Sequence, residues 1–131
     1  MAAGDEVVTL CGSTRFPEAF IKATRDLTLQ GKIVISVGLF GHQEGIDMGG
    51  PVKAMLDELH LRKIDISDSI FVLNDKSPWC DQCGKFRSDC HGCGYGFRGT
   101  FKPYIGESTR REIEYARSKG KRIDYLNPPE E

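Results

Sequence analysis

The sequence predicts a single α/β domain, residues 1–131, built on a doubly wound parallel sheet of the Rossmann/flavodoxin type. About four strands are expected, with helices on both faces of the sheet. Two observations predict this fold. Short apolar runs alternate with amphipathic stretches along the chain, which is the order of elements in a sheet joined by right-handed helical crossovers. At 131 residues the chain is also long enough to bury a core as one domain.

Four apolar runs are expected to form the strands. In Val7–Leu10 both faces are apolar or small, which is typical of a buried parallel strand. The other three strands are expected at residues 32–38, 69–73 and 122–126.

Three amphipathic stretches are expected to form the helices. In residues 17–30 the side chains of Phe20, Ala23 and Leu27 fall on one helical face, and Gly31 is placed to end that helix. The other two helices are expected at about residues 51–66 and 109–119. A glycine-rich loop, residues 39–50, precedes the middle helix and contains His42, Glu44 and Asp47.

An insertion at about residues 75–104 carries the strongest local signal in the chain. It holds two Cys-x-x-Cys pairs separated by six residues, namely Cys80, Cys83, Cys90 and Cys93. Four thiolates at this spacing match a closed tetrahedral site, so we expect a structural Zn²⁺ that fixes a loop over the cleft or an oligomer contact. Two disulfides are the weaker interpretation in a reducing cytosol. Cys11 stands apart and is expected to be a small buried residue rather than a ligand.

The overall charge restricts the classes of partner. The balance of 18 basic and 19 acidic residues gives no reason to expect nucleic acid or an anionic membrane. Basic residues in the insertion (Lys85, Arg87, Arg98 and Lys102) leave a nucleic-acid adaptor as a lesser alternative. No apolar stretch is long enough to span a bilayer, and the first residues lack signal-peptide anatomy. We therefore expect a cytoplasmic protein, or one of the host cytoplasm if it is viral. We also expect it to form a homodimer or a higher homo-oligomer.

Two loops have the chemistry of an anion site. The first runs from Cys11 through Gly12, Ser13 and Thr14 to Arg15, directly before a helix, and the second is Gly106–Thr109. Free amides and the positive dipole end of each helix would hold a phosphate. Ligands of parallel sheets bind at the carboxyl ends of the strands, so these loops should share one cleft. The side chains expected there are Ser13, Arg15, His42, Asp75, Ser108, Thr109 and Glu112.

Each of these features also has a plainer interpretation. The first loop could be an ordinary helix N-cap. Thr109 and Glu112 have the spacing of a capping box, in which the glutamate only returns a hydrogen bond to the helix start.

The two loops together resemble the nucleoside 2-deoxyribosyltransferase superfamily. The resemblance rests on Leu10–Arg15, which reads Leu-Cys-Gly-Ser-Thr-Arg, and on Gly106–Ala116, which reads Gly-Glu-Ser-Thr-Arg-Arg-Glu-Ile-Glu-Tyr-Ala. The first loop is most similar to that of the 2'-deoxynucleoside 5'-phosphate N-hydrolases. Between the loops, Leu61, Ile64 and the Ser67-Asp68 pair fit the family's approach to the third strand.

The resemblance implies cleavage, by hydrolysis or transfer, of the N-glycosidic bond of a nucleoside 5'-monophosphate, with Glu112 as the nucleophile. The structural Zn²⁺ expected from the cysteine spacing lies only in the insertion, and no organic cofactor is expected. The implied substrate- and phosphate-binding residues are Gly12, Ser13, Thr14, Arg15, Asp75, Gly106, Ser108 and Thr109.

Two positions depart from the family pattern. His60 stands where the family has an aspartate that helps protonate the leaving base, and a protonated imidazole could do the same. His60 could equally be a helix histidine at the edge of the core. Thr9 stands where the family has a tyrosine that orients the glutamate. Both departures favour the alternative of a non-catalytic nucleotide-binding or sensing module on the same fold.

Overall fold

The computed structural model describes residues 5–37, 50–90 and 100–129. His42, Glu44, Asp47, Cys93 and Arg98 lie outside these residues. In chain order the elements are β1 (Val7–Cys11), α1 (Pro17–Leu29), β2 (Ile33–Ile35), α3 (Gly50–Asp65), β3 (Ser69–Val72), β4 (Lys76–Cys80), β5 (Lys85–Phe86), the 3-10 helix η1 (Arg87–Asp89), β6 (Phe101–Pro103), α4 (Glu107–Ser118) and β7 (Arg122–Tyr125).

The central sheet is parallel and has four strands in the order β2-β1-β3-β7. In its middle, Thr9 of β1 pairs with Ile35 of β2 on one side and with Ile70 of β3 on the other. The next strand pair places Ile70 beside Ile123 of β7. The sequence-based prediction of an α/β protein with a four-stranded parallel sheet is confirmed.

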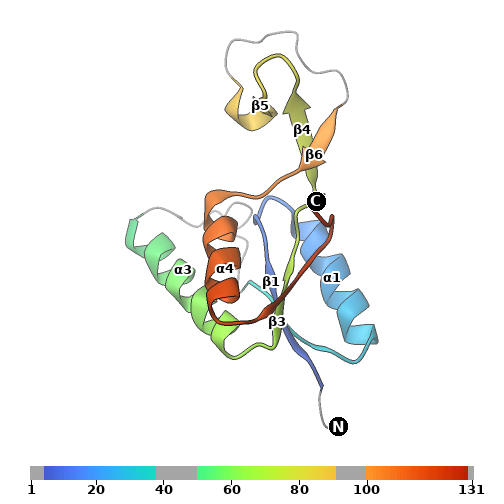
Figure 1. Cartoon of the computed structure of the whole chain (residues 1–131), viewed down its shortest axis with the longest axis vertical. Coiled ribbons are helices and arrows are strands. Elements are labelled where there is room, and N and C mark those ends of the chain that lie inside the picture. The colour runs from blue at the N-terminus through green and yellow to red at the C-terminus, as the bar shows by residue number, and fades with distance from the viewer. Residues whose placement is uncertain (1–4, 38–49, 91–99, 130–131) are drawn as a thin grey trace.

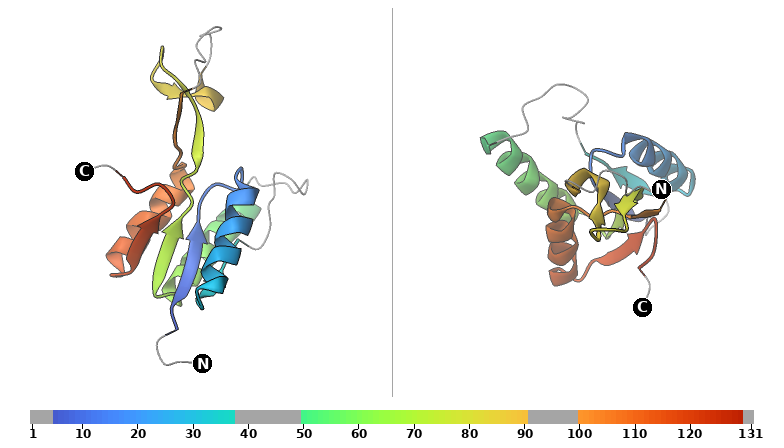
Figure 2. Two further views of the ribbon diagram at one scale, coloured as in Figure 1. Left: turned by 90° about the vertical axis from the view of Figure 1, so that its right-hand side faces the viewer. Right: turned by 90° about the horizontal axis from the view of Figure 1, so that it is seen from above.

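Helices cover both faces of this sheet (Figures 1 and 2). α1 packs on one face, where its Phe20 and Leu27 meet Val8 and Leu10 of β1. α3 and α4 pack on the other face, where the buried cluster is Cys11, Ile64, Ile70, Val72, Ile113 and Ala116. Successive side chains of a strand point to opposite faces, so β1 turns Val8 and Leu10 toward α1 and Cys11 toward α3 and α4.

The insertion is a small antiparallel sheet that stands beyond the carboxyl ends of the main strands (Figures 1 and 2). β4 lies in its centre and pairs with β5 and β6. Edge-to-face ring contacts continue from Trp79 to Phe86 and from Phe86 to Tyr104, with centroids 4.9 and 5.0 Å apart. Tyr104 in turn packs against Phe16, which caps α1. A line of aromatic rings therefore joins the insertion to the loop after β1.

The start of α4 differs from the sequence-based expectation. The helix begins at Glu107 with Gly106 as its N-cap, and no side chain of the described residues caps it. Thr109 is therefore inside the first turn, and Glu112 lies well within the helix. The capping-box interpretation of Thr109 and Glu112 is wrong, because that motif needs its first residue at the N-cap.

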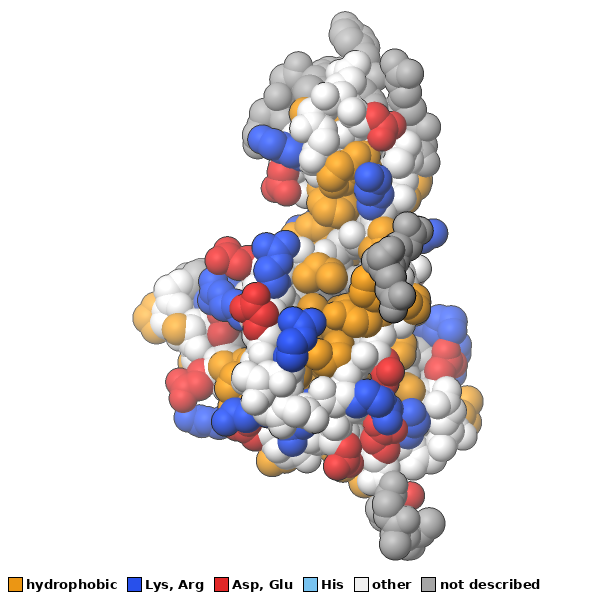
Figure 3. All heavy atoms as spheres, in the orientation of Figure 1, with side chains coloured by type: hydrophobic (Ala, Val, Ile, Leu, Met, Phe, Trp, Pro, Cys, Tyr) orange, Lys and Arg blue, Asp and Glu red, His pale blue; other side chains and the backbone are white. Residues whose placement is uncertain are grey.

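The surface and the helices bear on the expected partners. On the face drawn in Figure 3, basic and acidic side chains are interspersed rather than gathered into a patch of one sign. Among the described residues, no helix combines the length and the apolar character that crossing a membrane requires.

Candidate active site

A cavity of about 500 Å³ opens at the carboxyl end of the sheet, between the loop after β1, the helix α3 and the start of α4. The structure brings most of the predicted site residues together here. Those that line it are Gly12, Ser13, Thr14, His60, Gly106, Ser108, Thr109 and Glu112. Lys53, Lys63 and Tyr104, which the sequence did not single out for this site, line it as well.

Gly12 lies where the chain leaves β1 and passes close to Leu73. A Cβ atom built at this position would lie 3.0 Å from the Leu73 Cβ and 3.1 Å from the Leu73 carbonyl oxygen, so a larger residue would need Leu73 to shift by a few tenths of an ångström. The Leu73 amide donates to the Cys11 carbonyl at 2.7 Å. The glycine thus lets the loop cross tightly over the end of β3 and places Ser13 and Thr14 at the cavity wall.

Arg15 lies at the rim, on Tyr104. Its guanidinium carbon is 3.9 Å from the centre of the Tyr104 ring, and its Nη2 donates to the Tyr104 hydroxyl at 3.1 Å. A guanidinium held flat on an aromatic ring keeps part of its fork of donors free for a planar or tetrahedral anion.

Two described residues of the predicted set do not line this cavity: Arg15, which lies beside it on Tyr104, and Asp75. Asp75 borders a separate groove beside α1, and its carboxylate accepts a hydrogen bond from the Lys76 amide at 2.8 Å. Its expected place in the cleft is wrong. The chain turns away from the cavity after β3 to begin the insertion, and Tyr104 at the insertion's far end takes the position at the cavity.

The start of α4 and the facing residues of α3 form one wall of the cavity. The first amides of a helix have no partner within the helix, and here no described side chain caps them. Lys53 of α3 donates to the Ser108 hydroxyl at 2.9 Å and to the Asp57 carboxylate at 2.9 Å. Helix dipole, free amides and a lysine thus lie together at this end of the cavity, beside the carboxylates of Asp57 and Glu107, which also line it.

Glu112 lies at the floor of the cavity, with a side chain only 12% exposed. Burial raises the pKa of its carboxyl to about 7, and the nearby charge of Asp57 adds to this; the Cys11 thiol, Lys53 and Lys63 act in the opposite direction. Near neutral pH this carboxyl is therefore about half ionised, and it is more basic than an exposed glutamate.

His60 faces both Cys11 and Glu112. Its Nε2 is 3.5 Å from the Cys11 Sγ and 3.9 Å from the Glu112 Oε1. Burial, and then the charge of Lys63, lower the pKa of the imidazole to about 4, against the effect of its hydrogen bond to the Leu10 backbone. The ring is neutral at pH 7, so the protonated imidazole that the sequence allowed is not its resting state.

Cys11 is buried, as predicted, but it also lies beside the side chains of His60 and Glu112. It is fully buried at the end of β1. Burial, and then the charge of Glu112, raise the pKa of its thiol well above the usual value. Its Sγ lies 3.5 Å from the His60 Nε2 and within 4.8 Å of the Glu112 carboxylate. The signal for this was present in the two-residue period of the strand, which turns Cys11 to the face that α3 and α4 cover.

Thr9 does not orient Glu112. Its hydroxyl is buried and hydrogen-bonded to the Ser67 hydroxyl and, at 3.1 Å, to the Lys63 carbonyl. Cys11, two residues farther along the strand, is the residue of β1 whose side chain lies near the Glu112 carboxylate, within 4.8 Å.

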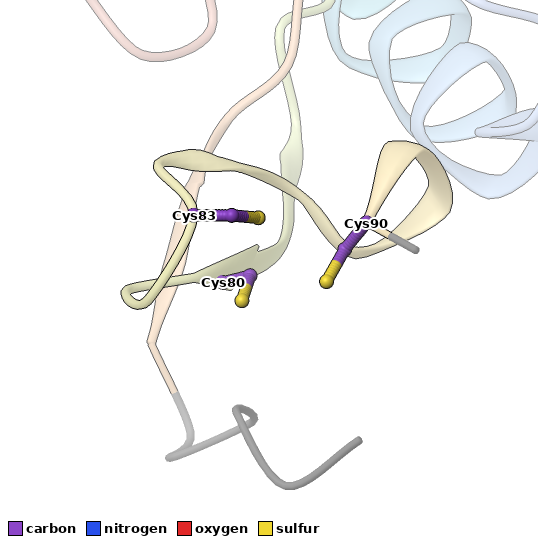
Figure 4. A group of neighbouring side chains, drawn as sticks. All are labelled: Cys80, Cys83 and Cys90. Carbon is purple, nitrogen blue, oxygen red and sulfur yellow. The ribbon is translucent and has the colours of Figure 1, made fainter. Parts of the chain in front are cut away.

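The cysteines of the insertion form a second group. The Sγ atoms of Cys80, Cys83 and Cys90 lie within 4.8 Å of one another, and the three side chains gather around one point at the turn between β4 and β5 (Figure 4). A backbone hydrogen bond from Cys83 is the main cause that lowers the pKa of the Cys80 thiol to about 6. Three close thiols, one of them easily ionised, can hold a metal ion; Cys93, the fourth predicted ligand, lies outside the described residues.

No family model, curated protein or solved structure matches this chain in comparisons of its sequence and fold.

Proposed function

We propose that this protein cleaves the N-glycosidic bond of a nucleoside 5'-monophosphate, with Glu112 as the nucleophile. The observation that carries the proposal is the position of this carboxyl. It is buried at the floor of a cavity whose walls, the loop after β1 and the start of α4, both present anion-binding groups.

The spacing along α4 fits a phosphorylated pentose. The free amides and Ser108 lie in the first turn, and Glu112 follows four residues after Ser108, which is about 6 Å along the helix axis. A phosphate held at the helix start would thus bring the anomeric carbon of its sugar to the carboxylate. Apolar side chains of α3, among them Leu56 and Leu59, line the cavity beside it and would receive the base.

In the proposed reaction the ionised Glu112 attacks the anomeric carbon. A bond forms between its carboxylate oxygen and that carbon, and the bond to the base nitrogen breaks with its electron pair going to the base, which takes a proton from solvent. Water, or a second base, then attacks the anomeric carbon and releases the carboxylate. The Cys11 thiol holds the carboxylate in place through its hydrogen bond, and neutral His60 packs against the pair.

The remaining parts of the proposal concern the framework. We propose a doubly wound sheet of the flavodoxin type, since the strand order reverses between β1 and β3, where the cavity lies. We propose a structural Zn²⁺ on Cys80, Cys83, Cys90 and Cys93, which requires reduced thiols and so a reducing compartment such as the cytosol.

A sensing module is the second candidate, because His60 is neutral and Thr9 lies away from Glu112. In that case the cavity would bind a nucleotide and release it unchanged.

One experiment separates the two functions. Wild-type protein is incubated with a panel of ribo- and deoxyribonucleoside 5'-monophosphates and the matching nucleosides, and released base is measured by chromatography while binding is measured by calorimetry. We expect base from at least one monophosphate, and more slowly from its nucleoside. Tight binding without release of base would establish the sensing module, and neither binding nor release would refute both functions.

A further inference from the structure

We propose that Cys11, His60 and Glu112 form a second metal site, which binds a thiophilic divalent cation of the Zn²⁺ class at the floor of the cavity. The three residues come from three different elements, β1, α3 and α4, and their ligand atoms all lie within 4.8 Å of one another. This site is separate from the cysteines of the insertion.

The distances between the ligand atoms fit a tetrahedral ion. With a Zn–S distance of about 2.3 Å and Zn–N of about 2.0 Å, tetrahedral ligands lie about 3.5 Å apart. The Cys11 Sγ and the His60 Nε2 are 3.5 Å apart. The Glu112 Oε1 is 3.9 Å from the same Nε2, so only a small movement of the carboxylate, whose side chain borders the open cavity, completes the set.

The hydrogen bonding of the His60 imidazole also fits a metal site. A metal-binding imidazole uses one ring nitrogen for the ion and donates from the other to a carbonyl or carboxylate, which fixes its orientation. His60 hydrogen-bonds to the Leu10 backbone while its Nε2 faces Cys11 and Glu112. The Nε2 atom of the ring therefore already faces the two other ligands, 3.5 Å from the Cys11 Sγ and 3.9 Å from the Glu112 Oε1.

Three protein ligands leave one position open, and that position faces the cavity, because His60 and Glu112 both line it. Binding releases the thiol proton of Cys11 to solvent and leaves a thiolate, an imidazole and a carboxylate on the ion. The ion then occupies the oxygen atoms that Glu112 would use for attack. Metal binding and nucleophilic cleavage at this site therefore exclude each other, and the metal-bound protein is inactive as a glycosidase.

The test uses the full chain with its insertion already filled by one equivalent of Zn²⁺, titrated with Co²⁺ and followed by absorption. Wild type should bind one further equivalent, with a sulfur-to-cobalt charge-transfer band from the single thiolate. Cys11→Ser should lose both the band and the equivalent, while Glu114→Gln, an exposed glutamate on the same helix, should behave as wild type. Should Cys11→Ser fail to fold, Glu112→Gln serves instead, with at least a tenfold weaker binding expected.

Binding without a charge-transfer band, or equal binding by wild type and by the folded variants, would overturn the proposal. The titration needs no substrate, so its result does not depend on the proposed glycosidase activity. A protein that binds the second cobalt ion but releases no base refutes only the glycosidase.

Discussion

Two groups of side chains that contain cysteine could each hold a metal ion, but they are brought together in different ways. Cys80, Cys83 and Cys90 come from one short segment, and their spacing alone predicts their meeting. Cys11, His60 and Glu112 come from three elements that only the folded sheet brings together. The first group joins parts of an appended sheet, and we propose a structural role for it. The second lies at the floor of a cavity, and we propose a chemical role for it.

The largest effect is expected from removing a proposed metal ligand in the insertion. Cys80→Ser should lose the tightly bound first equivalent of metal and unfold the insertion, because structural Zn²⁺ contributes about 10–16 kcal/mol in small zinc-binding peptides. Cys11→Ser is the control and should retain that equivalent. Metal content and thermal unfolding measure the effect. A Cys80→Ser protein with unchanged metal content and melting behaviour would remove the structural role.

The second prediction concerns the cost of burying Glu112. Its pKa is about 7 in the folded protein and 4.5 in the unfolded chain, so the folded state is penalised as pH rises through this range. The penalty is absent below pH 4.5 and complete above pH 7, where it amounts to about 3 kcal/mol.

Glu112→Gln should therefore melt several degrees higher than wild type at pH 8 and at nearly the same temperature at pH 4.5. The exposed Glu114→Gln should change neither. Melting curves at the two pH values check this. A stability gain that is the same at both pH values would show that burial does not perturb the Glu112 carboxyl.

The smallest expected effect is at the rim of the cavity. Arg15→Ala should weaken the binding of a nucleoside monophosphate by about tenfold or more, the loss of one charge-assisted hydrogen bond worth about 1.5–3 kcal/mol, and leave nucleoside binding nearly unchanged. Arg25→Ala, an exposed arginine on α1, is the control. Calorimetry measures the affinity of wild type and of each variant for both ligands. An equal loss of affinity for nucleotide and nucleoside would mean that Arg15 serves only to pack on Tyr104.

The sequence predicted the main sheet and the position of the cavity because both follow from local patterns. The spacing of the apolar residues predicted the strands and helices. The glycine-containing loops before α1 and α4 predicted which segments lie together at the cavity. Glu112 was found in the same way, as a carboxylate beside a phosphate-type loop.

What the sequence could not predict depends on contacts between distant segments. Cys11 gains its role only from His60 and Glu112, which are 49 and 101 residues away in the chain. The neutral state of His60 follows from its burial, which no spacing reveals. Asp75 was misplaced because the path of the chain after β3 depends on the insertion's own small sheet, whose strands of two to five residues are too short to show a period.

The most direct test of the account compares base release by wild type, Glu112→Gln and Glu114→Gln at pH 8, with the monophosphate that wild type cleaves fastest. A nucleophile changed to glutamine keeps its shape but cannot form the glycosyl ester. We predict that Glu112→Gln releases base at least about a thousandfold more slowly than wild type while Glu114→Gln matches it. Glu112→Gln within tenfold of wild type, or a wild type that cleaves no monophosphate, would contradict Glu112 as the chemical centre.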